Sequence, residues 1–421
     1  MAIQRRTWLI GGAAAALVAA GLARPGDRGG AHDSYFQRLA TALAGLPAQP
    51  TLVIDRTRLR ANLAAIRQRA QHPLRVVVKS LPSLALIDAA LAEWKSDRAM
   101  LFNAPQLALI AAQRPAVQLL LGKPLPASAA AWALDALRGD SAAPRRIEWL
   151  VDSAQRLAEY RALAQQRGLP LRINIEIDVG LHRGGVEDEA GFAALLDVLK
   201  SEPLLQFSGL MGYDAHLAAI PDLPGARSGA QAESQRRYAA LLALARQRLG
   251  EPAAPWTLNA AGSPTFQLHD PTSSANELSV GSAAVKPSDF DKPSLAALQP
   301  AAFIATPVLK DLGDFRLPRG VEWIAGAARA WDINQRRAFA MHGGHWLADP
   351  VSPPGVAPSG LYGPSSNQQV LVASPSAALQ PGDWLFLRPR QSEAVLLQFG
   401  ALAVVDEGQV VERWPVFDAS A

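Results

Sequence analysis

The sequence Leu74-Arg75-Val76-Val77-Val78-Lys79-Ser80 is a run of β-branched residues that ends on a lysine. Such a run is typical of a strand buried on both faces, as the strands of a parallel sheet are. Lys79 is therefore expected at the carboxyl end of the strand, where α/β barrels place their chemistry. Partial desolvation at an apolar barrel mouth favours the neutral amine, which can form a Schiff base with an aldehyde cofactor. The strand alone also allows a lysine that simply reaches solvent.

This run is one of eight short apolar runs that alternate with helical patterns over residues 51–300. Eight strands alternating with helices predict an α/β fold, a closed (β/α)8 barrel of the TIM type. A further strand is expected over 51–55 and a helix over 58–71. The eight runs are 74–79, 99–102, 117–121, 147–151, 171–178, 207–213, 257–261 and 278–285.

After residue 300 the pattern changes to short strands with Gly/Pro turns and almost no helical periodicity. We therefore expect a smaller all-β domain over 301–421 after a barrel domain over 51–300. A Pro/Gly/Ser-rich loop over 350–364 separates two of its strands. The expected strands are 303–309, 321–327, 337–341, 369–373, 383–387, 394–399 and 410–416.

The N-terminus contains Arg5-Arg6-Thr7-Trp8-Leu9-Ile10 before an Ala-rich apolar segment. This pattern predicts a twin-arginine signal peptide over 1–26 and delivery to the periplasm. The apolar part is short for a stable membrane span, although an uncleaved anchor is the alternative. Residues 27–50 are expected to form a linker and a short helix.

The composition narrows the possible partners and chemistry. The chain has 421 residues, a hydrophobic content of 49% and a net charge of +4, with 41 basic and 37 acidic residues spread along it. Nucleic acid is therefore not expected as a partner. The absence of cysteine excludes disulfides, thiolate metal sites and cysteine nucleophiles.

Polar side chains follow two further strands of the predicted barrel. Arg183 lies in the glycine-rich segment after the fifth strand, where its planar guanidinium can donate to a phenolic oxygen or a carboxylate. Tyr213 and His216 follow the sixth strand. Since the carboxyl ends of barrel strands share one mouth, these side chains are expected near Lys79.

The last two strands are followed by small residues suited to a phosphate. Gly262, Ser263 and Thr265 form a turn after the seventh strand, expected to enter a helix, and Gly281 and Ser282 follow the eighth. Bare backbone N–H groups and hydroxyls bind phosphate, and barrels favour a phosphate site shared by these two loops. Each turn alone is also compatible with an ordinary structural turn.

The order of these motifs resembles the pyridoxal-phosphate enzymes of the alanine-racemase barrel class, and within it the D-threonine aldolase and eukaryotic-type D-serine dehydratase family. The motifs are Val-Val-Val-Lys79, Asp178-Val-Gly-Leu-His-Arg183-Gly-Gly-Val186, Gly209-Leu-Met-Gly-Tyr-Asp-Ala-His216 and Gly262-Ser-Pro-Thr265. The resemblance implies that Lys79 carries pyridoxal 5'-phosphate as a Schiff base and that Arg183 contacts the phenolic oxygen. It places His216 and Tyr213 beside the ring, and the 262–265 turn on the phosphate.

The chain departs from that family at its divalent-metal site, which the family builds from a Glu-Glu-His segment and from a histidine two residues before a cysteine or aspartate. The corresponding segments here are Asn367-Gln368-Gln369 and Gln391-Ser392-Glu393. Amide oxygens replace imidazole poorly at a zinc or manganese site, so no metal is expected. His342, His345 and Asp349 lie close in sequence and are an alternative base or ligand set.

The predicted function is that of an exported, pyridoxal-phosphate-dependent lyase that cleaves a small D-3-hydroxy amino acid between Cα and Cβ. Racemisation or dehydration on the same cofactor is the first alternative. A non-catalytic exported binding protein is the second. The resemblance also implies a possible homodimer.

Overall fold

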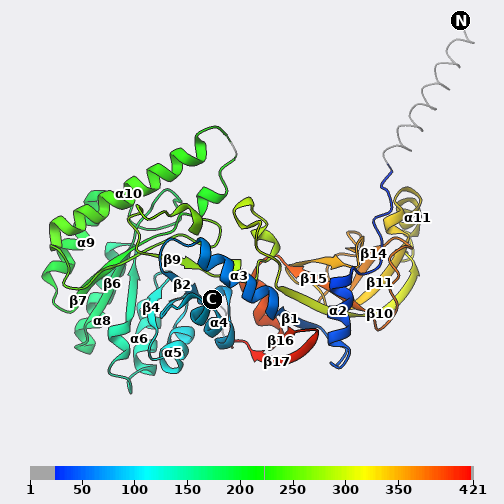
Figure 1. Ribbon diagram of the computed structural model, residues 1–421, viewed down its shortest axis with the longest axis horizontal. Helices are drawn as coiled ribbons and strands as arrows, with labels where there is room; N and C mark the ends of the chain where they lie inside the picture. Colours follow the sequence, from blue (N-terminus) through cyan, green and yellow to red (C-terminus); the bar gives the residue numbers. More distant parts are fainter. Residues whose placement is uncertain (1–23, 222, 419–421) are drawn as a thin grey trace, which may run out of the picture. The chain divides into compact units, whose positions relative to one another are not determined.

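The computed structural model describes residues 24–221 and 223–418, which divide into two compact units (Figure 1). One unit, the barrel unit, contains residues 54–302, 390–406 and 411–418 of this part. The other, the sheet unit, contains residues 24–53, 303–389 and 407–410. The chain thus leaves the barrel unit after residue 302 and returns to it at residue 390, whereas the sequence suggested one continuous domain over 301–421.

Eight parallel strands close into a barrel in the order of the sequence, from β2 to β9. Each predicted run overlaps one of them, so the α/β barrel followed by a mostly β unit is confirmed. The strands are short and their side chains are largely buried, as expected for a sheet covered on both faces. Their bounds are β2 Leu74–Val77, β3 Arg98–Leu101, β4 Gln118–Leu121, β5 Ile147–Val151, β6 Leu171–Glu176, β7 Leu205–Gly212, β8 Thr257–Ala260 and β9 Glu277–Val280.

Helices alternate with these strands, and several begin at a capping side chain. Asn103, Ser153 and Asp188 each accept a hydrogen bond from the backbone N–H three residues later, at the start of α5, α8 and α9. Between β8 and β9 the expected helix is absent, and a single 3-10 turn over Phe266–Leu268 stands there. The helices are α3 Arg56–Arg69, α4 Leu84–Trp94, α5 Ala104–Gln113, α6 Ala127–Ala136, α7 Ala143–Arg146, α8 Ala154–Arg167, α9 Glu189–Ser201 and α10 Ala226–Leu249.

The amino-terminal half of the barrel interior is charged. Arg75 of β2 is only 1% exposed and forms two parallel hydrogen bonds to Glu277 of β9, at 2.5 and 2.9 Å. Glu148 of β5 accepts hydrogen bonds from Asn174 and Ser208. Buried charges are costly unless they are paired, and these side chains are held by hydrogen bonds to one another around a second cavity at this end of the barrel.

The sheet unit contains helix α2 and a sheet in the order β13-β14-β11-β10, with β15 paired to both β10 and β12. Phe315, Leu317, Ala325, Ala338 and Val372 form a core cluster in it. The bounds are α2 Ser34–Leu43, β10 Ala302–Asp314, α11 Glu322–Trp331, β11 Arg337–His342, β12 Ala348–Ser352, β13 Ala357–Pro358, β14 Gln368–Ala373 and β15 Trp384–Pro389. The remaining elements are β1 Thr51–Asp55, α12 Ser392–Val395, β16 Ala401–Asp406 and β17 Gln409–Pro415.

Two strands expected after residue 300 are wrong. Residues 322–327 belong to helix α11, whose alanines favour a helix and whose Ala325 reaches the core cluster together with Ile324. Residues 394–399 form the end of α12 and a 3-10 turn over Leu396–Phe399. Both segments are apolar, and short apolar runs do not distinguish a strand from a buried helix.

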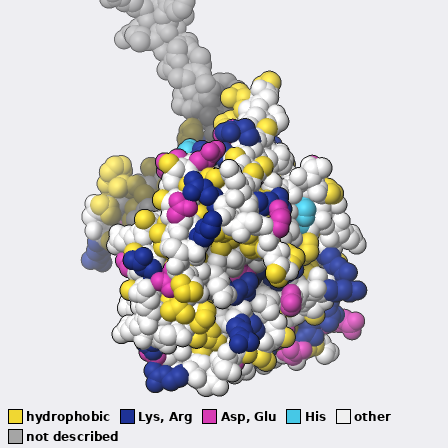
Figure 2. All heavy atoms as spheres, turned by 90° about the vertical axis from the view of Figure 1, so that its left-hand side faces the viewer, with side chains coloured by type: hydrophobic (Ala, Val, Ile, Leu, Met, Phe, Trp, Pro, Cys, Tyr) yellow, Lys and Arg dark blue, Asp and Glu magenta, His cyan; other side chains and the backbone are white. Residues whose placement is uncertain are grey.

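Charged side chains are mixed in sign on the surface of the barrel unit. Figure 2 shows basic and acidic side chains interspersed on the visible face rather than gathered in a stripe of one sign. Most of the predicted signal peptide lies outside the described residues. Within 24–221 and 223–418, no helix is both long and apolar enough to cross a membrane.

Candidate active site

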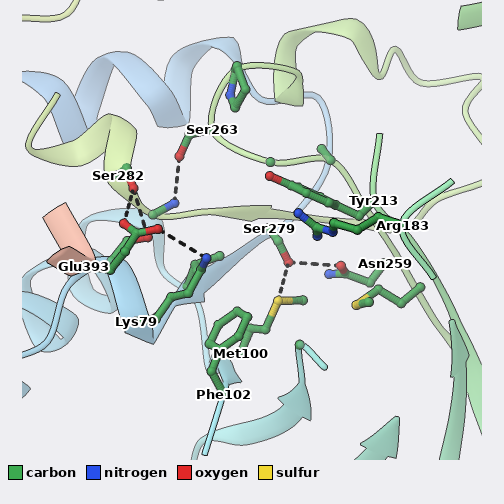
Figure 3. Close-up of a pocket in the computed structure, with 18 of the residues that line it drawn as sticks. Lys79, Met100, Phe102, Arg183, Tyr213, Asn259, Ser263, Ser279, Ser282 and Glu393 are labelled. Atoms are coloured by element: carbon green, nitrogen blue, oxygen red, sulfur yellow. Dashed lines mark hydrogen bonds and ion pairs between the residues drawn. The ribbon is translucent and has the colours of Figure 1, made fainter. Parts of the chain in front are cut away.

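A pocket lies at the carboxyl ends of the barrel strands (Figure 3). It encloses roughly 700 Å³ of empty space including its open mouth, which is within the range of about 300 to 1,000 Å³ typical of small-molecule sites. Seven of the nine predicted site residues line it. These seven are Lys79, Arg183, Tyr213, Gly262, Ser263, Gly281 and Ser282.

Lys79 enters the pocket from a tight turn. Strand β2 ends at Val77, and Val78–Ser80 form one 3-10 turn that buries Val78 and Ser80 while the Lys79 side chain stays 34% exposed. Its Nζ lies 3.3 Å from Oε1 of Glu393 and 5.1 Å from the centre of the Phe102 ring. The amine therefore stands in the pocket between a carboxylate and an aromatic face, rather than in open solvent.

Arg183 and Tyr213 lie across the pocket from Lys79 (Figure 3). The Arg183 guanidinium stacks 4.9 Å from the centre of the Tyr213 ring. Burial raises the pKa of the Tyr213 hydroxyl, so this phenol stays protonated. The stack presents a flat, cationic wall to the pocket.

The loop that carries Arg183 is held by its first and last residues. The Asp178 carboxylate accepts hydrogen bonds from the backbone N–H groups of Gly180 and His182, at 2.8 and 3.1 Å. Gly185 has a φ of +93°, and a Cβ there would lie 2.7 Å from the backbone of Ile177. Only glycine allows this close return of the chain, which fixes Arg183 at the mouth of the barrel.

The loops after β8 and β9 are tied together where a phosphate was predicted. Ser263 Oγ accepts hydrogen bonds from the N–H groups of Gly281 and Ala283, both at 3.1 Å. A Cβ on Gly262 would lie 2.7 Å from the Tyr213 ring. The absence of that side chain lets the loop lie flat against the tyrosine, so backbone and hydroxyl groups border the pocket at this side.

Thr265 and His216, the other two predicted site residues, do not line the pocket. Thr265 is fully buried, and its hydroxyl donates to Asp214 at 2.6 Å and accepts from the Gly262 N–H at 3.1 Å. His216 lies behind the Arg183 loop with Nε2 3.4 Å from Ser234 Oγ, and burial lowers its pKa. Both side chains support the loops from behind.

Two carboxyl groups in the pocket were not assigned a role from the sequence. Glu176 ends β6, and burial, with a smaller contribution from Asp152, raises its pKa to about 7. Glu393 comes from the segment that returns to the barrel unit after residue 390. Glu176 and Asp178 are two positions apart, a spacing that in a regular strand predicts the same face, so periodicity alone could not separate Glu176 in the pocket from Asp178 in the loop. The resemblance related the segment 391–393 to the family's metal site, but it did not predict the contact between Glu393 and Lys79.

The alanine-racemase resemblance is borne out by comparison with known proteins. Residues 54–289 match the family described as alanine racemase, N-terminal domain. The chain belongs to this family. The 3-hydroxy-D-aspartate aldolase of Paracoccus denitrificans is 28% identical over 142 residues, which cover 34% of this chain and only 36% of that relative.

Solved structures share the fold over almost the whole chain. The D-threonine aldolase of Filomicrobium marinum covers 87% of this chain and 94% of its own, with a TM-score of 0.68 and 20% identity. The D-threo-3-hydroxyaspartate dehydratase of Delftia sp. HT23 covers 90% and 99%, with a TM-score of 0.70 and 17% identity. At these identities the likeness concerns the fold, so substrate and reaction must be argued from the site.

Pyridoxal 5'-phosphate is the cofactor of this family, and the residues of the pocket fit it. Lys79 offers the amine for the aldehyde, and Phe102 and Met100 offer apolar surface for the ring. Ser263, Gly281 and Ser282 line the side of the pocket where the phosphate is expected, and the Ser263 hydroxyl accepts from the Gly281 N–H there. A Cβ on Gly281 would lie 2.8 Å from Ser80 Cβ, so the glycine there keeps the two loops in close contact.

The alternative metal ligands named from the sequence are not brought together. Among the described residues, the one group of three whose ligand atoms lie within 4.8 Å of one another is Asp178, His182 and Glu187. It does not include His342, His345 or Asp349. In the two segments that the resemblance related to a metal site, Gln369 Oε1 accepts from the His345 N–H at 2.8 Å, and Gln391 donates to Asp289 at 3.0 Å. The amides at both places form hydrogen bonds within the protein.

Proposed function

We propose that the protein is a pyridoxal-phosphate-dependent lyase that cleaves a small D-3-hydroxy amino acid between Cα and Cβ. The observation that carries this proposal is the Lys79 amine, which stands in a pocket whose far wall is the Arg183–Tyr213 stack. The aldolase relative, although aligned over a third of its length, supports the substrate class. Dehydration and racemisation are the alternative reactions.

Different residues of the pocket have different roles in such a reaction. Lys79 would bind the cofactor covalently, and the loops after β8 and β9 would hold its phosphate. Arg183 would donate a hydrogen bond to the phenolic oxygen, while Phe102 and Met100 would keep water from the ring. When bound, the cofactor supplies an electron sink for the bond that breaks, and the protein decides which bond that is. Tyr213 holds the Arg183 guanidinium in its plane.

The Lys79 assignment predicts a coloured protein whose visible band depends on this one amine. Borohydride should bleach the band of the purified holo-protein and fix the cofactor to the peptide that contains Lys79. Lys79→Ala should lose the covalently linked component, whereas Lys200→Ala, a change on the exposed side of α9, should keep it. Peptide mapping that finds the cofactor on another lysine would refute the assignment.

An amino-acid screen on the same holo-protein distinguishes the reactions. Aldehyde, oxo acid and the opposite enantiomer should be measured together in each assay, because they report cleavage, dehydration and racemisation. We expect aldehyde and glycine from a D-3-hydroxy amino acid. A protein that retains its cofactor but never exchanges Lys79 for an added amino acid would be a binding protein instead.

We also propose that the protein is exported to the periplasm through its Arg5-Arg6 segment. The twin-arginine route carries folded proteins, which suits an enzyme that must take up its cofactor in the cytoplasm. Pairing of two chains stays a prediction of the family resemblance, and light scattering of the holo-protein measures it.

A further inference from the structure

Among the residues that the structure describes, Glu393 is the one carboxylate that forms an ion pair with Lys79. Its Oε1 lies 3.3 Å from the Lys79 Nζ, and its Oε2 lies 3.1 Å from Ser392 Oγ and 3.5 Å from Ser282 Oγ (Figure 3). The Glu393 side chain is 30% exposed and lines the pocket. It is therefore held by a lysine and two hydroxyls, yet remains open to a bound molecule.

The position of Glu393 relates it to one particular substrate atom. In a pyridoxal-phosphate reaction the substrate amine would take the place of the Lys79 amine. In a 3-hydroxy amino acid the β-hydroxyl oxygen is three bonds from that amine, so a staggered torsion brings the two atoms close together. A group that touches the Lys79 amine is consequently within reach of the β-hydroxyl once the substrate is bound.

The other groups of the pocket are less suited to contact the β-hydroxyl. Glu176, the second acidic side chain of the pocket lining, lies close enough to Arg183 and Asp178 to interact electrostatically with both. No histidine is among the described residues that line the pocket. A single carboxylate with hydroxyls is at best a weak oxygen site for a divalent metal, and a poor one for zinc or manganese.

We propose that Glu393 is the base that takes the proton of the substrate's β-hydroxyl, a role for which no bound metal is needed. The inference rests on the proposed function. The O–H bond breaks and its proton goes to the Glu393 carboxylate, while the electron pair left on oxygen forms the C=O bond of the aldehyde. The Cα–Cβ bond breaks, and its electron pair stays with Cα, which takes up a proton from the solvent to give glycine, while Glu393 releases its proton to the solvent.

Glu393→Gln tests this assignment because it keeps the size of the side chain and removes its basicity. Glu251→Gln, in which an exposed glutamate is changed at a distance from the pocket, is the matched control. Aldehyde release from a D-3-hydroxy amino acid should fall on the order of 10²- to 10⁴-fold in Glu393→Gln, the usual contribution of a general base. Glu393→Asp should recover part of the rate.

Two readouts separate this role from a structural one. D-2-aminobutyrate lacks the β-hydroxyl. Its dissociation constant from Glu393→Gln, read from the visible band of the holo-protein, should match its dissociation constant from the wild type. The Cα hydrogen of glycine should exchange with deuterium from the solvent, and Glu393→Gln should slow this exchange far less than aldehyde release. If Glu393→Gln lowered the exchange rate and the rate of aldehyde release by the same factor, the inference would be overturned, since Glu393 would then act through Lys79.

The outcomes also distinguish a failure of the inference from a failure of the proposed function. Wild-type protein that releases no aldehyde from any 3-hydroxy amino acid contradicts the proposed function itself. Wild-type release that Glu393→Gln leaves unchanged contradicts only the role of Glu393. EDTA should leave the wild-type rate nearly intact, and a rate that EDTA abolishes and Mn²⁺ restores also overturns the inference.

Discussion

At the scale of single residues, the raised pKa of Glu176 predicts how stability depends on pH. The folded protein binds this proton more tightly than the unfolded chain, so the contribution of the neutral form is present below the usual pKa of 4.5 and is lost as the pH rises through about 7. The difference corresponds to roughly 3 kcal/mol. Glu176→Gln should not lose this stability as the pH rises. It should therefore be more stable than the wild type at pH 8, as measured by urea unfolding of cofactor-free protein. Equal pH slopes for Glu176→Gln and wild type would contradict the burial argument.

The site residues that could be predicted are those that directly follow a barrel strand. The site residue that could not be predicted is brought to the pocket by a distant part of the chain. Lys79, Arg183 and Tyr213 follow barrel strands and meet because all parallel strands end at one mouth. His216 comes from the same loop as Tyr213, but its ring turns behind the Arg183 loop. Glu393 is separated from Lys79 by more than three hundred positions, and no periodicity indicates such a contact.

At the scale of elements, strand β7 depends on a glycine. Gly209 has a φ of +151°, and a Cβ there would lie 1.8 Å from the carbonyl oxygen of Thr257 on the neighbouring strand β8. Gly209→Ala must push the two strands apart, which should cost on the order of 3 kcal/mol or more in the free energy of unfolding. Gly229→Ala in α10 meets no atom within 4 Å and should stabilise by about 0.5 to 1 kcal/mol. Thermal unfolding compares the two, and an unchanged midpoint for Gly209→Ala would contradict the backbone clash.

Barrel strands were predictable and several elements after residue 300 were not, for a physical reason. The barrel strands are buried on both faces, so each is a compact apolar run between helical patterns. Strand β12, with the sequence Ala-Asp-Pro-Val-Ser over Ala348–Ser352, has little apolar pattern. In such segments tertiary contacts, rather than local preference, select the structure.

At the scale of the whole molecule, the proposed export depends on the first residues, which lie outside the described part of the chain. Replacing both Arg5 and Arg6 with lysine keeps the charge but removes the paired arginines that the transport route reads. The variant should stay in the cytoplasm, folded and with its cofactor, as cell fractionation and the visible band would show. Arg28→Lys, beyond the predicted signal, should leave delivery unchanged. Undiminished periplasmic delivery of the double variant would count against the twin-arginine interpretation.

The return of the chain to the barrel unit at residue 390 has a consequence for the order of synthesis. A ribosome makes Lys79 early and Glu393 only after the whole segment 303–389 of the sheet unit. Domains generally fold as they emerge, the amino-terminal one first. A nascent barrel is thus expected to present the reactive lysine well before its carboxylate partner exists, so the unfinished chain can acquire a cofactor before it is able to use one.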